Sequence, residues 1–178
     1  MNFLELVKKR QSVRKYSDKV VSKDVLERCL EAARLAPSAC NSQPWSFIVV
    51  DSPELKNKVV EAAFSGIYSS NFFAKSAPVL IAVITEHSKF IAALGGYFRG
   101  TQYNLIDVGI AAEHFILQAA EEGLGTCWLG FFNEKAVKKV LNIPKEKKVD
   151  IIISVGHPAD DKIREKSRRP LKEIAKFL

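Results

Sequence analysis

The stretch that decides the fold covers residues 102–130 and reads Q-Y-N-L-I-D-V-G-I-A-A-E-H-F-I-L-Q-A-A-E-E-G-L-G-T-C-W-L-G. Apolar side chains fall on nearly every helical face, which predicts a long helix from about Gln102 to Glu122. Such a helix is either buried all round or packed against another chain. Gly123 or Gly125 can end it, because glycine accepts a left-handed conformation. The β-branched and aromatic residues of Thr126–Phe131 then predict a strand.

Patterns typical of helices and of strands also occur on both sides of this stretch. Continuous apolar runs of strand length are typical of strands buried on both faces, and apolar residues at helical spacing predict helices. The alternation indicates one domain, residues 1–178, with an α/β or α+β sandwich fold whose strand order stays open. The predicted strands are Trp45–Asp51, Val79–Thr85 and Val149–Val155, and the further helices are Asn2–Arg10, one from Ser22 to before Pro37, Pro53–Phe64 and Asn133–Leu141.

The composition narrows the class of protein. With 47% hydrophobic and 26% charged residues the chain is globular, and its apolar runs are too short for a membrane span. Three widely spaced cysteines argue against a disulfide framework and for a reducing, cytoplasmic location. The histidines are scattered and no metal-ligand spacing occurs, so we expect no metal site. These residues are Cys29, Cys40, Cys127, His87, His114 and His157.

The net charge of +7 raises the possibility of nucleic acid binding. However, the basic residues alternate with acidic ones, and no aromatic residues are interleaved with the basic runs. An anionic small molecule explains the charge as well, so we expect no nucleic acid partner.

A short polar segment, R-Q-S-V-R, places Arg10, Ser12 and Arg14 at alternate positions. In an extended segment alternate side chains point the same way, so three donors could converge on a phosphate. A second basic run, K-S-R-R-P, could bring Arg168 and Arg169 to the same place. Both segments could equally be solvated basic surface.

Two further segments suit a flat ligand. Residues 36–45, A-P-S-A-C-N-S-Q-P-W, form a stiff loop whose Ser38, Asn41 and Gln43 offer donors and acceptors to the edge of a heteroaromatic ring. Simple turn chemistry is the alternative. Gly130 lies where the chain leaves a strand, and glycine there allows the backbone to approach a ligand closely.

Together these segments resemble the nitroreductase family of flavoproteins. Their order along the chain is that of the family: K-R-Q-S-V-R, then A-P-S-A-C-N-S-Q-P-W, then D-x-G-x-A at Asp107, Gly109 and Ala111, and G-L-G-T-C-W-L-G. The resemblance covers nearly the whole chain. It implies an α+β fold, a three-layer sandwich with a mixed, mainly antiparallel sheet and a C-terminal tail exchanged between the subunits of a homodimer. Two FMN molecules would lie in the interface, each touched by both chains.

The resemblance also implies roles for individual residues, and the chain departs from the family at Gln11, where arginine is frequent, and at Glu113, where an amide or another polar residue is common. Loss of the charge at Gln11 would weaken the hold on the pyrimidine edge of the flavin. The implied FMN contacts are Arg10, Ser12 and Arg14 at the phosphate and ribityl chain, with Arg168 or Arg169; Pro37, Ser38, Ala39, Asn41 and Gln43 from the partner chain; Leu129 and Gly130 as backbone donors near flavin N5; and Asn71 at the ring.

The implied activity is reduction of nitroaromatics, quinones or related small-molecule acceptors by NADH or NADPH, with hydride passing through flavin N5 in a ping-pong scheme. No G-x-G-x-x-G follows a strand, which fits two substrates sharing one cleft. A specialised flavoenzyme of the same fold (dehydrogenation, dehalogenation or flavin breakdown) is the alternative, with residues 64–76 and 86–101 as candidate lids. A non-enzymatic anion-binding module is the third. The sequence leaves open the physiological acceptor, NADH against NADPH, and one- against two-electron chemistry.

Overall fold

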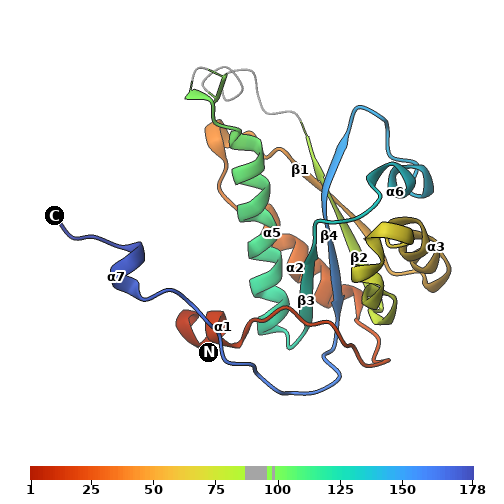
Figure 1. Ribbon diagram of the computed structural model, residues 1–178, viewed down its shortest axis with the longest axis horizontal. Coiled ribbons are helices and arrows are strands. Elements are labelled where there is room, and N and C mark those ends of the chain that lie inside the picture. Colours follow the sequence, from red (N-terminus) through yellow and green to blue (C-terminus); the bar gives the residue numbers. More distant parts are fainter. Residues whose placement is uncertain (87–95, 98) are drawn as a thin grey trace.

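A sheet of four strands forms the centre of the molecule, in the order β1-β2-β4-β3 with every neighbouring pair antiparallel (Figure 1). The structure is a computed structural model and describes residues 1–86, 96–97 and 99–178. The strands are β1 (Trp45–Val50), β2 (Val79–Thr85), β3 (Gly125–Leu129) and β4 (Lys148–Gly156). They confirm the predicted strand segments and supply the order that the sequence left open.

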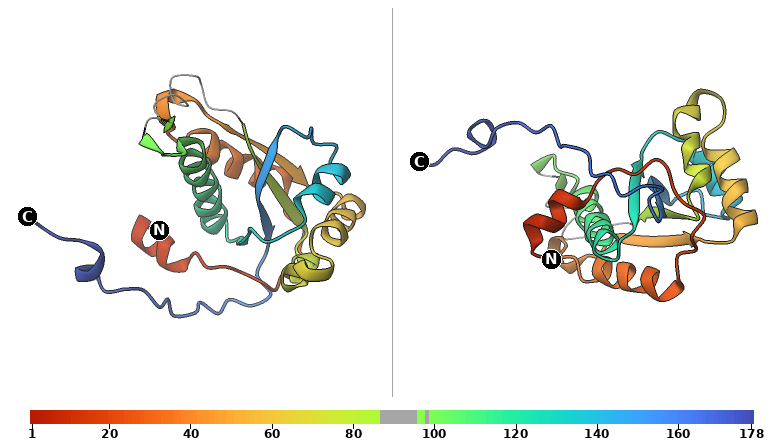
Figure 2. Two further views of the ribbon diagram at one scale, coloured as in Figure 1. Left: turned by 45° about the horizontal axis from the view of Figure 1, so that its top comes forward. Right: turned by 90° about the horizontal axis from the view of Figure 1, so that it is seen from below.

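Both faces of the sheet are covered, as the continuous apolar strands predict. Leu80, Ala82 and Ile84 of β2 belong to one buried cluster, and the alternate residues Ile81 and Val83 belong to another. Helices lie over each face and complete a three-layer α+β sandwich (Figures 1 and 2). The helices over the first face are α3 (Pro53–Ala63), η2 (Gly66–Ser76) and α6 (Glu134–Val140), and those over the second are α2 (Lys23–Arg34) and α5 (Tyr103–Glu121).

The long predicted helix is α5, and its sequence explains its place in the fold. Eight of its residues, including Phe115 and Ile116, are buried against the sheet and α2. Two large apolar residues near its start point outward, Leu105 at 43% and Ile106 at 51% exposure. The helix is therefore buried on one broad face only, and an apolar surface remains at its beginning.

The two ends of the chain meet beside β3. After α1 (Phe3–Lys9) the chain runs extended, and Ser12 forms an isolated parallel bridge with Thr126. The same segment runs antiparallel to the chain that leaves β4, through the Tyr16–Pro158 bridge and an Ala159 N–H donated to a backbone carbonyl. We call this pairing of residues 8–17 with 157–166 the terminal ribbon.

Two glycines let the terminal ribbon lie flat on the sheet. A Cβ on Gly125 would lie 2.5 Å from Cγ2 of Val13, and one on Gly156 would lie 2.4 Å from Cδ of Pro78. Real Cβ atoms essentially never show such distances, so a side chain at either position would force its neighbours to move. The hydroxyl of Tyr16 adds a hydrogen bond of 2.7 Å with Oγ of Ser154, a fully buried residue of β4.

The C-terminal tail leaves the body beyond the ribbon (Figures 1 and 2). It carries the short helix α7 (Leu171–Ile174) and exposes four large apolar residues. Leu171 and Ile174 are more than 60% exposed, and Phe177 and Leu178 are almost fully exposed. The single chain does not cover these side chains.

Candidate functional site

A cavity of about 300 Å³ opens beside the terminal ribbon, and it collects the predicted phosphate ligands. Arg10, Ser12, Arg14 and Arg168 all line it, so two segments more than 150 residues apart in sequence meet there. We call it the phosphate cavity. Arg169 lies elsewhere: its guanidinium donates to the carbonyl and faces the carboxylate of Glu173.

The local structure explains why three residues of one segment share the cavity. The N–H of Val13 donates to the Thr126 carbonyl at 2.8 Å, which holds the segment extended along the edge of β3. Val13 is buried against Gly125. Its neighbour Ser12 has the thiol of Cys127 as a side-chain partner, and the Arg14 guanidinium lies 5.9 Å from the centroid of the Phe73 ring. The buried valine thus fixes the segment on β3, and Arg10, Ser12 and Arg14 all line the cavity beside it.

The structure adds two cations that the sequence reasoning missed, Arg164 and Lys166, both of which line the phosphate cavity. Arg164 donates to the Ser12 carbonyl, and Lys166 donates to the Lys8 carbonyl. Arg164, Lys166 and Arg168 alternate as Arg10, Ser12 and Arg14 do. This alternation at every second residue could have indicated Arg164 and Lys166 from the sequence alone. Arg169 does not follow the alternation.

Gln11 holds Arg164 in place. Its Nε2 donates to the Lys162 carbonyl at 2.8 Å, and its Oε1 accepts the backbone N–H and the Nε of Arg164 at 3.1 and 3.2 Å. The departure from the family pattern at this position thus has a structural consequence. An amide can accept the Arg164 N–H, whereas the arginine common in the family has no acceptor.

Arg10 also faces α5. Its Nε lies 3.9 Å from Oε1 of Glu113, and the Trp128 indole is a second partner of this carboxylate. Burial raises the pKa of Glu113, and the positive charge of Arg10 opposes the shift. The side chain of Arg10 is 22% exposed, so the surrounding residues restrain the guanidinium at the edge of the phosphate cavity.

The end of β3 is the predicted ring site. Leu129 is buried, whereas Gly130 is exposed, and a Cβ placed on Gly130 would meet only Cδ1 of Ile151, at an ordinary 3.7 Å. Gly130 is therefore accessible from outside the chain, and a side chain there would make one ordinary contact. Asn71 lies at the same end, because its Nδ2 donates to the Phe131 carbonyl at 3.0 Å.

The predicted ring-edge loop contains a short helix, η1 (Ala39–Asn41), and a backbone that side chains rarely adopt. Cys40, Asn41 and Gln43 have φ of 53°, 50° and 49°. Such conformations cost about 1–3 kcal/mol each and are concentrated at functional sites. The Ser38 hydroxyl accepts the Gln43 N–H at 2.9 Å, and Nε2 of Gln43 donates to Oδ1 of Asn41 at 2.9 Å.

Asp107 anchors this loop to α5. It is 4% exposed, and its Oδ1 accepts the Ala39 N–H at 3.1 Å. Its Oδ2 has no hydrogen-bond partner among the described residues. The loop, which begins at Pro37, does not reach the phosphate cavity, whose lining contains none of its residues. One chain therefore brings together the phosphate and ring positions along β3 and leaves the loop outside that group.

The first candidate lid, residues 64–76, packs on the body. The ring centroids of Tyr68 and Phe131 lie 4.8 Å apart, and Ala74 is buried. Most of the other candidate lid, residues 86–101, lies outside the described residues.

Among the described residues no cluster of three or more potential ligands could hold a metal ion, and none of their helices is long and apolar enough to cross a membrane.

A family model described as the nitroreductase family matches residues 7–157. The chain belongs to the nitroreductase family. A protein of Archaeoglobus fulgidus, provisionally named an NADH dehydrogenase/NAD(P)H nitroreductase, is 36% identical over 89% of this chain and 87% of its own length. The solved FMN-dependent nitroreductase of Clostridium difficile R20291 is 30% identical, with a TM-score of 0.79 over 98% of each chain.

A third relative points toward the alternative activity. The iodotyrosine deiodinase of Thermotoga neapolitana is 28% identical over 89% of both chains. Family membership makes the protein an oxidoreductase enzyme of the nitroreductase type. It also confirms the nitroreductase-like fold that the sequence motifs predicted.

Proposed function

We propose that this nitroreductase-family protein binds FMN and uses NADH or NADPH to reduce small acceptors such as nitroaromatics and quinones. The observation that carries the proposal is the phosphate cavity, where Arg10, Ser12 and Arg14 converge with cations from the far end of the chain. Bound FMN would supply hydride transfer at N5 of its ring.

The residues present fit the phosphate end of this group. Guanidinium groups bind phosphate through two parallel hydrogen bonds, and such charge-assisted bonds contribute about 1.5–3 kcal/mol each. The Ser12 hydroxyl adds a neutral donor, and Glu113 restrains Arg10 at the edge of the cavity. Contacts of Arg10 with Glu113 and of Arg164 with Gln11 support the proposal, because restrained cations lose less freedom when they bind a phosphate.

The residues at the end of β3 fit the ring. Thr126 lies beside the phosphate segment and Gly130 follows the strand, so the two ends are separated by about 13 Å along the strand. The exposure of Gly130 would let a flat ring approach the backbone. We assign Leu129 and Gly130 as donors toward N5 and Asn71 as a ring contact.

The loop needs a second copy of the chain in this proposal. Pro37, Ser38, Ala39, Asn41 and Gln43 lie outside the phosphate cavity of their own chain. A homodimer would bring them to the flavin of the partner and would cover the exposed apolar residues of α5 and of the tail. Exchange of the tail between subunits is part of the same proposal.

Replacement of Arg10 and Arg14 by alanine tests the proposal. We expect FMN affinity to fall at least about a hundredfold, because two charge-assisted contacts are removed. The control is the double variant Lys135→Ala, Lys139→Ala, which removes the same two charges from exposed positions on α6. Fluorescence titration of FMN measures binding, and circular dichroism checks the fold. Stoichiometric flavin in a folded Arg10, Arg14 variant would refute the site.

Reductive dehalogenation is a second candidate, supported by the similarity to the Thermotoga neapolitana deiodinase. The two activities share the flavin site and differ in the acceptor. Anaerobic reduction of the flavin-loaded protein, followed by reoxidation with quinones, nitroaromatics and halotyrosines, separates them. Faster reoxidation by nitroaromatics and quinones supports the main proposal, and faster reoxidation by halotyrosines supports the second. Parallel initial-rate plots for nucleotide and acceptor are expected for a shared cleft.

A further inference from the structure

The terminal ribbon carries more positive charge than one FMN phosphate can neutralise. A second cavity of about 320 Å³ adjoins the phosphate cavity and shares four lining residues with it: Gln11, Ser12, Arg14 and Arg164. Seven cationic and only two acidic side chains line the two cavities, a net charge of +5 within a chain of net +7. Glu113 also faces Arg10, and a phosphomonoester carries about −1.5 to −2, so roughly two positive charges remain.

The fold places four of these cationic side chains close together. Lys166 lies near Arg10, Arg164 and Arg168, and burial together with these three cations lowers its pKa. Cations held this close repel one another unless an anion lies between them. The arrangement is therefore suited to more than one anionic group.

The second cavity has its own cations, which the phosphate cavity does not use. Lys15 and Lys162 line it from the two strands of the ribbon, with Asp160 as its single acidic residue. The ribbon keeps both lysines in place: the Lys15 carbonyl accepts the Ala159 N–H at 3.0 Å, and the Lys162 carbonyl accepts from Gln11. Arg14 and Arg164 stand between the cavities and can contribute to both.

We propose that the second cavity binds the 2′-phosphate of NADPH, so that the enzyme prefers NADPH to NADH. This inference rests on the proposed function, which places the nicotinamide over the flavin ring near Gly130. The rest of the nucleotide would then run back along β3 toward the ribbon, a distance of about 13 Å or more that its pyrophosphate and second ribose can span. Its terminal phosphate would lie beside the FMN phosphate, across Arg14 and Arg164.

A double lysine variant tests this site without changing the proposed flavin contacts. In Lys15→Ala, Lys162→Ala protein loaded with FMN, calorimetry with NADP⁺ and NAD⁺ measures the contribution of the 2′-phosphate directly. We expect unaltered protein to bind NADP⁺ at least about tenfold more tightly than NAD⁺, and the variant to lose most of that preference. The KM for NADPH should rise by a similar factor, while the KM for NADH stays unchanged.

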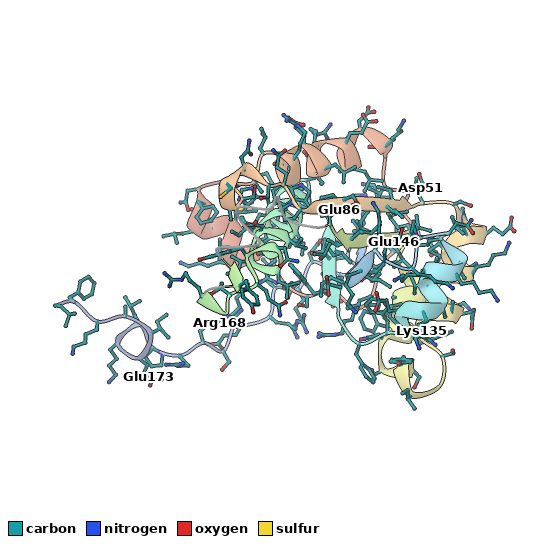
Figure 3. All side chains as sticks on the ribbon, turned by 90° about the horizontal axis from the view of Figure 1, so that it is seen from above. Asp51, Glu86, Lys135, Glu146, Arg168 and Glu173 are labelled. Carbon is teal, nitrogen blue, oxygen red and sulfur yellow. The ribbon has the colours of Figure 1, made fainter. Side chains whose placement is uncertain are left out.

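The control is again Lys135→Ala, Lys139→Ala, which removes equal charge from α6; Figure 3 shows Lys135 at the end of the molecule opposite Arg168. Equal affinity of unaltered protein for NADP⁺ and NAD⁺ would overturn the inference. So would loss of FMN in the Lys15, Lys162 variant, because the second cavity would then belong to the flavin site. Lysine-dependent binding of inorganic phosphate without a preference for NADP⁺ would show an anion site that is not a nucleotide site, and would also overturn it.

Failure of the inference can be told apart from failure of the proposed function. A protein that binds FMN and is reduced equally by both nucleotides contradicts only the second phosphate site. A protein that takes up no FMN contradicts the proposed function itself.

Discussion

Gly125 offers the sharpest test of how the sheet positions the phosphate segment. Alanine there would place a Cβ 2.5 Å from Cγ2 and 2.8 Å from Cβ of Val13. Ordinary contacts begin near 3.4 Å, so the segment must move by about 0.9 Å away from β3. Overpacking of this kind costs about 1–3 kcal/mol, which lowers the melting temperature by about 2–10 °C for a chain of this length.

The same displacement acts on the site, because Ser12 and Arg14 flank Val13. A shift near 1 Å takes their donors out of hydrogen-bond range of a bound phosphate, so we expect FMN affinity to fall roughly tenfold or more. Differential scanning calorimetry and fluorescence titration measure the two effects on the same protein.

Gly123→Ala is the matched control. Gly123 has a φ of 76° with nothing within 4 Å of an added Cβ, so alanine there strains the backbone by about 1–2 kcal/mol without moving Val13. Stability should fall in both variants and FMN affinity only in Gly125→Ala. An unchanged FMN affinity in Gly125→Ala, or an equal loss in Gly123→Ala, would show that β3 does not position the segment.

Three further outcomes are expected. Gly130→Ala should keep its melting temperature, because the added Cβ meets only Ile151 at 3.7 Å, yet lose flavin reduction rate; unchanged rates in stopped-flow measurements would place the ring elsewhere. Burial raises the pKa of Glu113, so the carboxylate destabilises the folded state as pH rises above the ordinary glutamate range. Glu113→Gln should therefore match unaltered protein in melting temperature below the ordinary glutamate range, gain on it as pH rises from that range through the raised pKa, and keep a constant advantage at higher pH. A pH-independent difference would contradict this reasoning. Gln11→Ala should leave the fold intact and lower the affinity for FMN about tenfold, because Arg164 loses its hydrogen bonds to the Gln11 side chain. An unchanged affinity for FMN would show that Gln11 does not position Arg164 for the phosphate.

The parts of the fold that local patterns determine were predictable. Continuous apolar strands indicated a sheet covered on both faces, and Asn133 caps α6 as expected, accepting the Ala136 N–H. Ser22 precedes α2 as expected, although its side chain makes no capping hydrogen bond. The strand order depends on contacts between distant segments, which no local pattern contains.

The same distinction applies to the site. The alternation of Arg10, Ser12 and Arg14 is local, and all three residues line one cavity. The choice among the tail cations depends on the register of the terminal ribbon, which Gln11 fixes through hydrogen bonds across more than 150 residues. Arg164 was therefore missed, and Arg169 turned to Glu173 instead.

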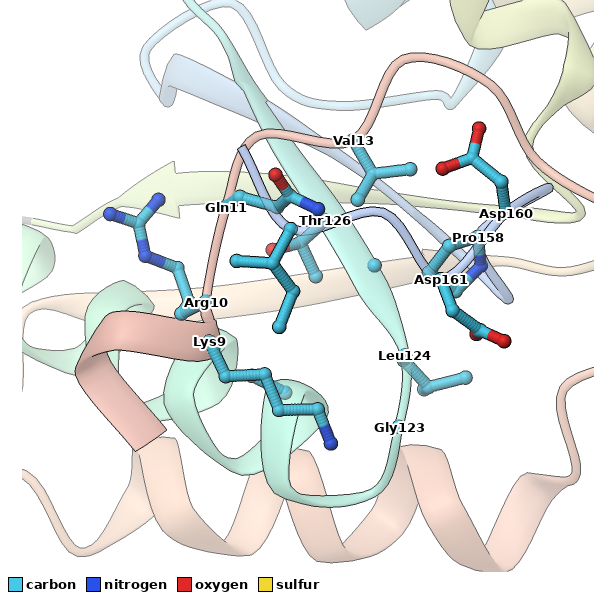
Figure 4. A pocket seen from close by; sticks show the side chains of 13 residues that line it. Lys9, Arg10, Gln11, Val13, Gly123, Leu124, Thr126, Pro158, Asp160 and Asp161 are labelled. Carbon is cyan, nitrogen blue, oxygen red and sulfur yellow. The ribbon is translucent and has the colours of Figure 1, made fainter. Parts of the chain in front are cut away.

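A third hollow lies beside the terminal ribbon (Figure 4). This hollow of about 390 Å³ lies between the ribbon and the end of α5, with Lys9 and Asp161 at its mouth and Leu124 in its wall. Its charged lining residues are Lys9, Arg10, Asp160 and Asp161, two of each sign. Arg10 also lines the phosphate cavity and Asp160 also lines the second cavity, but there the cations outnumber the acidic side chains by seven to two. The anionic ligands are therefore assigned to those two cavities.

The loop supplies the last argument for a shared site. Its strained backbone is held by Ser38 and Asp107, yet it contributes nothing to the cavity of its own chain. If each flavin takes its loop from the partner, subunits carrying Asn41→Ala and subunits carrying both Arg10→Ala and Arg14→Ala should complement each other when mixed and reassembled. Each hybrid dimer would then hold one intact site, and random exchange should restore about a quarter of the unaltered activity. Activity no greater than that of the two parents would mean that each flavin is held by one chain alone.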